Sequence, residues 1–215
     1  RQQGHTPGEI THAALAGRTV HPLKIVYDGK NQHVVIPTIG RHNVYNALAA
    51  FGTGVQLGVT AEEAVKGLAK YTPSGMRQRM KTVNGIKFIE DCYNASPDSQ
   101  RAALKMLSEM KAERKIAVLG DMLELGTISE ESHRNAGLLA AKAKVDVFMT
   151  YGERSLASAE KARECGVREV YGFTDKKALA DKLFETLKPG DAVLFKASRG
   201  MALEDVINDL YGRIK

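Results

Sequence analysis

Residues 115–142 read KIAVLGDMLELGTISEESHRNAGLLAAK, and this stretch decides the fold. An apolar run of strand length is followed by a polar, glycine-bearing loop and then by a segment with helical periodicity. The same alternation continues to the end of the chain. We expect strands at residues 86–90, 115–119, 145–150, 169–171 and 192–196, and helices at residues 98–110, 130–142, 155–164, 176–187 and 202–211. Five strand–helix units in a row predict an α/β fold, a mostly parallel sheet with helices on both faces.

Residues 1–75 have a different sequence pattern, rich in turn-forming residues. β-Branched residues at 20–26 and 32–36 flank the turn sequence DGKN, which predicts a hairpin. A helix is expected at 43–57 and another up to residue 71, and the sequence TPSG at 72–75 predicts a linker. The apolar face of the first helix is expected to contain Val44, Leu48, Phe51 and Val55. We therefore expect a partial α/β subdomain at 1–75, followed by the parallel-sheet domain at 76–215.

Three helix starts carry capping signals. Thr60 with Glu63 three residues later forms a capping-box pattern. Ser96 precedes Pro97, a residue favoured at the first helical position. Thr174 is the expected N-cap of the helix near residue 176.

The composition excludes several classes of protein. The chain has 215 residues with a formal net charge of +6, 43% hydrophobic and 26% charged residues, as in ordinary globular proteins. Uncharged apolar stretches reach about six residues, against roughly 20 for a membrane span, and no signal peptide is expected. Lys and Arg are dispersed, which disfavours nucleic acid as a partner. Two cysteines, Cys92 and Cys165, make no disulfide framework or metal motif, so we expect a reducing, cytoplasmic setting.

Three polar loops follow strands at the edge of the sheet where ligands bind in such folds. They are residues 91–97 (DCYNASP), 120–126 (GDMLELG) and 196–200 (KASRG). Each alone has a structural explanation, since Asp91 would cap a turn, Asp121 would fix a turn and Arg199 would extend along the surface. Three such loops at one edge favour a ligand-binding site over three unrelated structural turns. The net charge of +6 leaves two interpretations open, a solvated basic surface or a binding site for a polyanion such as a nucleotide phosphate.

Several catalytic motifs are absent from the sequence. There is no G-x-x-x-x-G-K-[ST] phosphate loop and no G-x-G-x-x-G after the first strand of the parallel sheet. There is also no G-x-S-x-G elbow, and Cys92 has no His partner nearby in the sequence. The parallel-sheet domain alone is therefore not a standard dinucleotide- or nucleoside-triphosphate-binding domain, and the sequence gives only weak support for hydrolase chemistry.

An ordered series of segments resembles the Mur ligase superfamily. The series consists of residues 40–50 (GRHNVYNALAA), Arg79-Met80, 91–99 (DCYNASPDS), 120–126, His133, 196–199 (KASR), Met201 and Glu204. Within the superfamily, D-x-Y-N-A-x-P-D-S and G-D-M-x-E-L-G are most similar to the members that add a dipeptide. The resemblance implies an ATP-dependent ligase that adds D-alanyl-D-alanine to UDP-N-acetylmuramoyl-tripeptide through an acyl phosphate, in peptidoglycan precursor synthesis.

The resemblance also implies a domain organisation. Residues 1–75 match the end of a central ATPase domain, and residues 76–215 match a carboxy-terminal Rossmann-like domain. The phosphate-loop lysine, the Mg²⁺-binding Glu and His, and the carbamylated lysine of the family have no counterpart in this sequence. We therefore expect ATP and Mg²⁺ as cofactors of the whole enzyme, no metal ligand in this piece, and no turnover by this piece alone. A monomer is expected.

For the nucleotide, the resemblance implies Asn43 and Asn46 at the adenine, Arg79 at the phosphates and Asp91 at the ribose hydroxyls. An amide both accepts and donates hydrogen bonds, and a guanidinium fork fits phosphate oxygens. Gln78 stands where the family usually has Gly, which leaves the register between Arg77 and Arg79 open.

For the acceptor dipeptide, the resemblance implies six residues: Tyr93, Asn94, Ala95, Lys196, Ser198 and Arg199. A cation there would hold the terminal carboxylate of D-Ala-D-Ala. Ala197 replaces the usual glycine of the family and adds a Cβ to this loop. His133 is expected to cap or orient the 120–126 loop.

Two alternatives remain open from the residues. One is a related ligase that adds a single amino acid, diaminopimelate or lysine, although such enzymes usually carry a D-Y-A-H-T-P type segment. The other is a Rossmann-like binding module without catalysis. A phosphate loop encoded before Arg1, or binding of D-Ala-D-Ala to the chain, would distinguish the ligase from the module.

Overall fold

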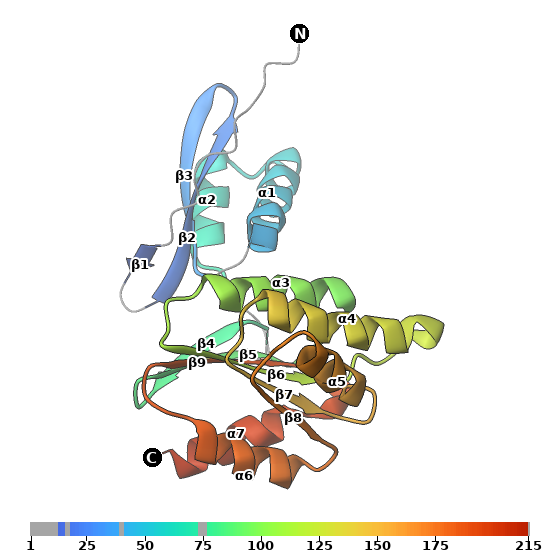
Figure 1. Ribbon diagram of the computed structural model, residues 1–215. Helices are drawn as coiled ribbons and strands as arrows, with labels where there is room; N and C mark the ends of the chain where they lie inside the picture. Colours follow the sequence, from blue (N-terminus) through green and yellow to red (C-terminus); the bar gives the residue numbers. More distant parts are fainter. Residues whose placement is uncertain (1–12, 16–17, 39–40, 73–76, 215) are drawn as a thin grey trace. The chain divides into compact units, whose positions relative to one another are not determined.

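The computed structural model describes residues 13–15, 18–38, 41–72 and 77–214, drawn in Figure 1. The chain divides into two units, Arg1–Pro73 and Ser74–Lys215, and each is described by itself. The expected linker at 72–75 lies mostly outside the described residues.

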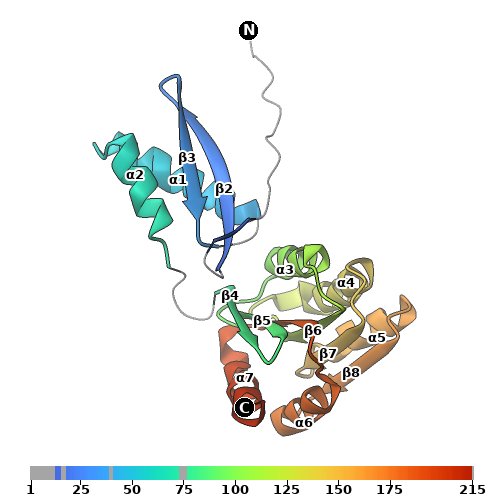
Figure 2. The same ribbon diagram turned by 90° about the vertical axis from the view of Figure 1, so that its left-hand side faces the viewer.

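The first unit is an antiparallel sheet with two helices packed on it. Its strands β1 (Ala13–Leu15), β2 (Arg18–Tyr27) and β3 (Lys30–Ile36) pair in chain order. Asp28 and Gly29 connect β2 and β3 with φ of 48° and 69°, so the predicted hairpin is confirmed as one with a two-residue turn. The helices α1 (Arg41–Gln56) and α2 (Ala61–Ala69) follow, as Figure 2 shows.

The helices of the first unit confirm one prediction and correct another. The capping box is present, because the Thr60 side chain accepts from Glu63 N and the Glu63 carboxylate accepts from Thr60 N. The predicted apolar face of α1 is wrong at Leu48, which is 40% exposed. Ala47 and Phe51 are the buried residues of α1 in the core of this unit.

The second unit is built on a six-stranded sheet. Its strands are β4 (Arg79–Val83), β5 (Ile86–Asp91), β6 (Arg114–Gly120), β7 (Val147–Tyr151), β8 (Glu169–Phe173) and β9 (Asp191–Lys196). The strand order is β4-β5-β9-β6-β7-β8, and the five strands from β5 to β8 in that order are parallel. The predicted α/β class and mostly parallel sheet are confirmed.

Strand β4 was missing from the sequence prediction. It pairs antiparallel with β5 through the turn Asn84-Gly85, whose two residues have φ of 48° and 77°. Its sequence, RMKTV, is mostly polar, and its residues are exposed or half-buried, with none fully buried. An edge strand of this kind carries little of the apolar signal on which strand prediction depends.

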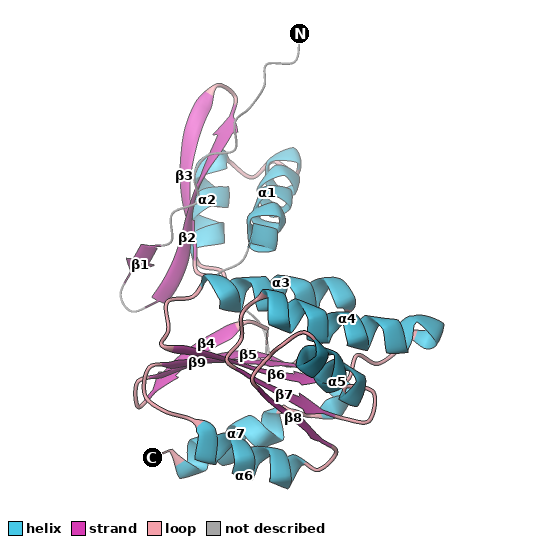
Figure 3. Ribbon diagram, viewed as in Figure 1, coloured by secondary structure: helices cyan, strands magenta, loops and turns pink. Residues whose placement is uncertain are grey.

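Helices cover both faces of this sheet, as Figures 1 and 3 show. One face carries α3 (Pro97–Glu109), α4 (Ser129–Lys142) and α5 (Leu156–Glu164), and the other carries α6 (Lys176–Thr186) and α7 (Glu204–Arg213). The chain advances across the sheet from β5 to β8 and then returns through α6 to β9. Because parallel crossovers are right-handed, the reversal places α6 on the opposite face.

At the starts of α3 and α6, the structure confirms one predicted N-cap and corrects the other. Ser96 caps α3 by accepting from Ser99 N, and Pro97 is its first residue, as predicted. The predicted cap Thr174 is wrong, because Asp175 caps α6 by accepting from Ala178 N at 2.8 Å. A carboxylate placed one residue later satisfies the same helix amides.

The core of the second unit lies between the sheet and its helices. All six residues of the central strand β9 are buried, including the two charged ones, Asp191 and Lys196. Among the described helices, none has the length and apolar character needed to cross a bilayer.

Candidate functional site

The carboxyl ends of β5 and β9 form the switch point of the sheet. After β5 the chain turns to α3 on one face, and after β9 it turns through the short 3₁₀ helix η2 (Arg199–Met201) to α7 on the other. In open α/β sheets, ligands bind where neighbouring strands send their connections to opposite faces. The three polar loops singled out in the sequence follow β5, β6 and β9 at this edge.

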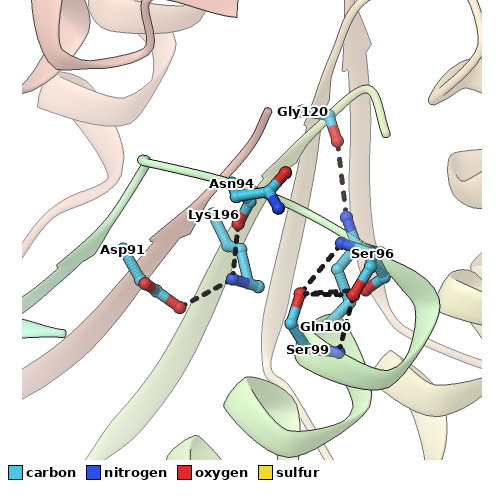
Figure 4. A network of polar contacts seen from close by, with 7 residues as sticks. All are labelled: Asp91, Asn94, Ser96, Ser99, Gln100, Gly120 and Lys196. Atoms are coloured by element: carbon cyan, nitrogen blue, oxygen red, sulfur yellow. Dashed lines mark hydrogen bonds and ion pairs between the residues drawn. The ribbon is translucent and has the colours of Figure 1, made fainter. Parts of the chain in front are cut away.

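Asp91 and Lys196 are the last residues of β5 and β9 and are register partners. The Lys196 ammonium donates to Asp91 Oδ2 at 2.7 Å and to the backbone carbonyl of Asn94 at 2.9 Å, as Figure 4 shows. The Lys196 side chain is 2% exposed and that of Asp91 is 11% exposed. The ammonium therefore joins the end of β5 to the loop that follows it.

This placement changes the interpretation of Lys196. An ammonium has three donor hydrogens, and these two bonds use two of them. Its role as a ligand for a substrate carboxylate stays a prediction. In the structure its buried charge is balanced by Asp91, and it holds the Asp91 carboxylate and the Asn94 carbonyl in place.

Ser198 ties the loop after β9 to the loop after β6. Its amide donates to Asp121 O at 3.1 Å, and its hydroxyl oxygen accepts from Leu123 N at 2.9 Å. Between these two residues, Met122 N donates to Nε2 of His133, at 3.0 Å. The expectation that His133 orients the 120–126 loop is confirmed.

Asp121 is a structural residue of this edge. Its buried carboxylate accepts from the amide and hydroxyl of Ser155, at 2.8 and 2.6 Å, and from Arg154 N at 3.4 Å. It thereby holds the start of α5 at the end of β6. Gly152 has φ of +113°, and a Cβ there would lie 2.5 Å from this carboxylate, so only glycine fits. These bonds agree with the structural explanation given for Asp121, that it fixes a turn.

Arg199 is an exposed cation at the carboxyl edge of β9. Its side chain is 62% exposed and forms an ion pair with Glu204, the first residue of α7. Oε2 of Glu204 is buried and has no hydrogen-bond partner among the described residues. The guanidinium has five N–H donors, so the pair with Glu204 leaves donors for an anion.

The loop after β5 contributes one exposed ring and one buried methyl. The Arg77 guanidinium stacks on the Tyr93 ring at 4.0 Å from its centroid, and Tyr93 is 45% exposed. Asn94 is exposed, whereas Ala95 is buried in the core. Contact between the Ala95 side chain and a ligand therefore stays a prediction, and the local role of this methyl is packing.

Arg79 lies on the edge strand β4, opposite Glu90 of β5. Its guanidinium is 4.0 Å from the buried Glu90 carboxylate, and Tyr211 of α7 donates its hydroxyl proton to Glu90. Burial and the bond to Glu90 raise the pKa of Tyr211 above its ordinary value. The sequence analysis did not single out Glu90 or Tyr211. Glu90 could have been found, because a charged residue inside an apolar strand is unusual.

Two departures from the family pattern now have a physical description. Gln78 has φ of +49°, a conformation that costs an L residue more than glycine, which explains why glycine suits this position. Ala197 is fully buried and its methyl lies against Gly120, where a Cβ would be 2.7 Å from it. The loop therefore accepts Ala197 because residue 120 is glycine.

Asn43 and Asn46 lie together in the first unit, on α1. Asn43 Nδ2 donates to Thr38 Oγ1 at 3.0 Å, and Asn46 Nδ2 donates to Asn43 Oδ1 at 3.2 Å. Their proposed contact with adenine is not addressed by these bonds and stays a prediction.

The described residues offer little support for thiol or metal chemistry. Burial, followed by the charge of Asp91, raises the pKa of Cys92 well above its ordinary value, so its thiol stays protonated at neutral pH. Across the described ranges, no three His, Cys, Asp or Glu side chains gather in a group that could hold a metal ion. The implied Mg²⁺ thus has no fitting set of ligands among them.

Gln100 of α3 is a polar residue of this edge that the sequence reasoning did not single out. It is 1% exposed, and its Nε2 lies 3.4 Å from the carbonyl of Gly120, as Figure 4 shows. Its Oε1 has no partner among the described residues. The sequence of α3 does not indicate that Gln100 is buried, because its burial depends on the segment that follows β6, which is distant in the sequence.

Comparisons with known proteins agree with this geometry. Residues 76–199 match the protein-family model described as "Mur ligase, glutamate ligase domain". The UDP-N-acetylmuramoyl-tripeptide–D-alanyl-D-alanine ligase of Bacillus subtilis (strain 168) is 42% identical over 178 residues, which cover 81% of this chain and 39% of the relative. The ligase of the same name from Escherichia coli (strain K12) is 35% identical over 181 residues, covering 82% of this chain and 38% of the relative.

Solved structures show the same relationship. MurF from Acinetobacter baumannii superposes with a TM-score of 0.80 at 29% identity, over 90% of this chain and 43% of that one. MurF from Thermotoga maritima in complex with ADP has a TM-score of 0.77 at 22% identity, which shows the fold alone. The chain spans about two fifths of the length of these relatives. Because the family model matches more than half of its residues, the chain belongs to the Mur ligase family.

Proposed function

We propose that this chain is part of an ATP-dependent amide ligase that joins D-Ala-D-Ala to UDP-N-acetylmuramoyl-tripeptide, in the cytoplasm. The observation that carries the proposal is the switch-point edge, where Lys196 is held by Asp91 and is followed by Ser198 and the exposed Arg199. The names of the two ligase relatives support this choice of substrates.

The reaction has two steps. The donor carboxylate attacks the γ-phosphoryl group of ATP, giving an acyl phosphate and ADP. The free amine of D-Ala-D-Ala then attacks the acyl carbon, the bond to phosphate breaks, and the amine gives up a proton as the amide forms. Because both steps place negative charge on oxygen atoms, cationic groups fixed in advance stabilise their transition states.

In this proposal the second unit binds the acceptor dipeptide. Arg199 pairs with the terminal carboxylate, because its guanidinium is exposed and a carboxylate fits its fork. Ser198 donates its hydroxyl proton to the same anion, since Leu123 N already occupies its oxygen. Tyr93 and Asn94 border the dipeptide on the side of the β5 loop.

The nucleotide contacts are a second part of the proposal. Asp91 accepts from ribose hydroxyls, Arg79 binds phosphate oxygens, and Asn43 and Asn46 bind adenine. Asp91 suits this task because the Lys196 ammonium binds Oδ2 of its carboxylate, which leaves Oδ1 as an acceptor. The described residues provide no ligand group for Mg²⁺, so none of them is assigned a role in holding it.

The test is calorimetric titration of the 215-residue chain with D-Ala-D-Ala, with L-Ala-L-Ala as the control ligand. We expect heat with the D,D dipeptide and at least about tenfold weaker binding by Arg199→Met, since a lost charge-assisted bond costs about 1.5–3 kcal/mol. Binding of diaminopimelate or lysine in place of the dipeptide would instead identify a ligase for single amino acids. Absence of heat with D-Ala-D-Ala, diaminopimelate and lysine would overturn the proposed acceptor site.

A further inference from the structure

The loop between β6 and α4 is held at consecutive residues by two different partners. Ser198 bonds Asp121 O and Leu123 N, while the His133 imidazole bonds Met122 N, the residue between them. His133 is 1% exposed and Ser198 is 6% exposed. The position of the Leu123 amide, which meets the Ser198 hydroxyl, therefore depends on the imidazole next to it.

The hydrogen bonds of His133 also determine its tautomer. Nε2 accepts from an amide, so it carries no hydrogen, and Nδ1 lies 2.7 Å from Ser129 O, to which it donates. The backbone carbonyl of His133 accepts from Ser158 Oγ at 2.6 Å. The residue is thus anchored to α5 at its backbone, and its ring spans from the first turn of α4 to the 120–126 loop.

We propose that His133 is a positioning residue for the acceptor site, acting through Met122 and Leu123 on the Ser198 hydroxyl. With Leu123 N bound to its oxygen, the Ser198 hydroxyl hydrogen is directed away from the loop and toward a ligand oxygen. Without the imidazole acceptor, Met122 N loses a buried partner and the loop shifts. Leu123 then no longer fixes the direction of the hydroxyl. This inference rests on the proposed function for its ligand, a dipeptide carboxylate.

A matched pair of substitutions separates this role from general stability. In His133→Gln the side-chain amide oxygen reaches the position of Nε2 and still accepts from Met122 N. In His133→Asn the shorter amide reaches only the position of Nδ1. Ser158→Ala is the control for destabilisation, because it removes a buried bond to the His133 backbone and leaves the imidazole unchanged.

Two measurements are made on the 215-residue chain. The first is amide hydrogen exchange at Met122 and Leu123, which needs no ligand, and the second is the Kd for D-Ala-D-Ala. We expect faster exchange at both amides and about tenfold weaker binding in His133→Asn. Exchange and affinity close to wild type are expected in His133→Gln and Ser158→Ala.

The outcomes distinguish the inference from the proposed function. Wild-type exchange at Leu123 in His133→Asn overturns the inference whether or not the dipeptide binds. Equal loss of affinity in His133→Asn and Ser158→Ala also overturns it, because the effect is then one of stability alone. If the wild-type chain does not bind the dipeptide, the proposed function fails, and the exchange rates alone decide whether His133 positions the loop.

Discussion

The Lys196 ammonium lies in the interior of the second unit, 2.7 Å from the Asp91 carboxylate. Removing one partner of a buried charge pair leaves the other charge without compensation, which costs about 3–5 kcal/mol. We therefore expect Lys196→Met to lower the free energy of unfolding by that amount, measured by urea denaturation. The double variant Asp91→Asn/Lys196→Met should recover most of the loss, and a single variant that costs less than about 1 kcal/mol would contradict the assigned pair.

The raised pKa values of two residues, Cys92 and Tyr211, make the stability of the second unit depend on pH. The pKa values of Cys92 and Tyr211 are raised by burial, and that of Tyr211 also by Glu90, so both groups keep their protons in the folded state. Above their ordinary pKa values of 9.0 and 10.0, the unfolded chain loses protons that the folded chain retains. The contribution of these two groups to stability is therefore constant below about pH 9 and decreases as the pH rises through 9 and 10.

Tyr211→Phe tests this dependence. Above pH 10, we expect the unfolding free energy of the variant to fall less steeply with pH than that of the wild type. One titrating group can change this slope by at most about 1.4 kcal/mol per pH unit, and the change is smaller for Tyr211 because it is only half-buried. Urea denaturation at a series of pH values from 8 to 11 measures the slopes, and equal slopes in the two proteins would refute the assignment.

Among the elements, the packing of α4 on α5 depends on one glycine. A Cβ at Gly137 would lie 2.2 Å from the carbonyl oxygen of Ser158, whereas a Cβ at Gly212 of α7 would meet no atom within 4 Å. Gly137→Ala should destabilise the second unit by about 1–3 kcal/mol through overpacking. Gly212→Ala should be neutral or stabilising by up to about 1 kcal/mol. Thermal unfolding compares the two, and similar melting temperatures would show that the helices adjust.

The sequence predicts the regular elements of the molecule better than it predicts their partners. The parallel strands are apolar runs, and the Thr60 and Ser96 caps are local bonds, so both are visible over a few residues. Strand β4 has too few buried residues to give such a signal. The contact of Lys196 with a ligand was implied by the family resemblance and stays a prediction. Its bond to Asp91 could not be predicted, because the two residues are 105 positions apart in the sequence and only the pairing of β5 with β9 joins them.

For the molecule as a whole, the proposed reaction needs parts that this sequence lacks. The 215 residues contain no G-x-x-x-x-G-K-[ST] phosphate loop to hold the nucleotide phosphates. We therefore expect no ADP release above background when the chain is supplied with ATP, Mg²⁺, UDP-N-acetylmuramoyl-tripeptide and D-Ala-D-Ala. A coupled assay for ADP measures this, with an intact ligase from Bacillus subtilis as the positive control. Sustained turnover by the chain would contradict the expectation.

The central claim is that the carboxyl edge of β5 and β9 binds the acceptor dipeptide. Amide chemical shifts of the ¹⁵N-labelled chain, recorded during titration with D-Ala-D-Ala, test it directly. The claim predicts saturable shifts at Asn94, Leu123, Ser198 and Arg199, with no change at Arg114 or Asp191 near the opposite ends of the strands. Shifts confined to that opposite end, or none at dipeptide concentrations in the millimolar range, would contradict it.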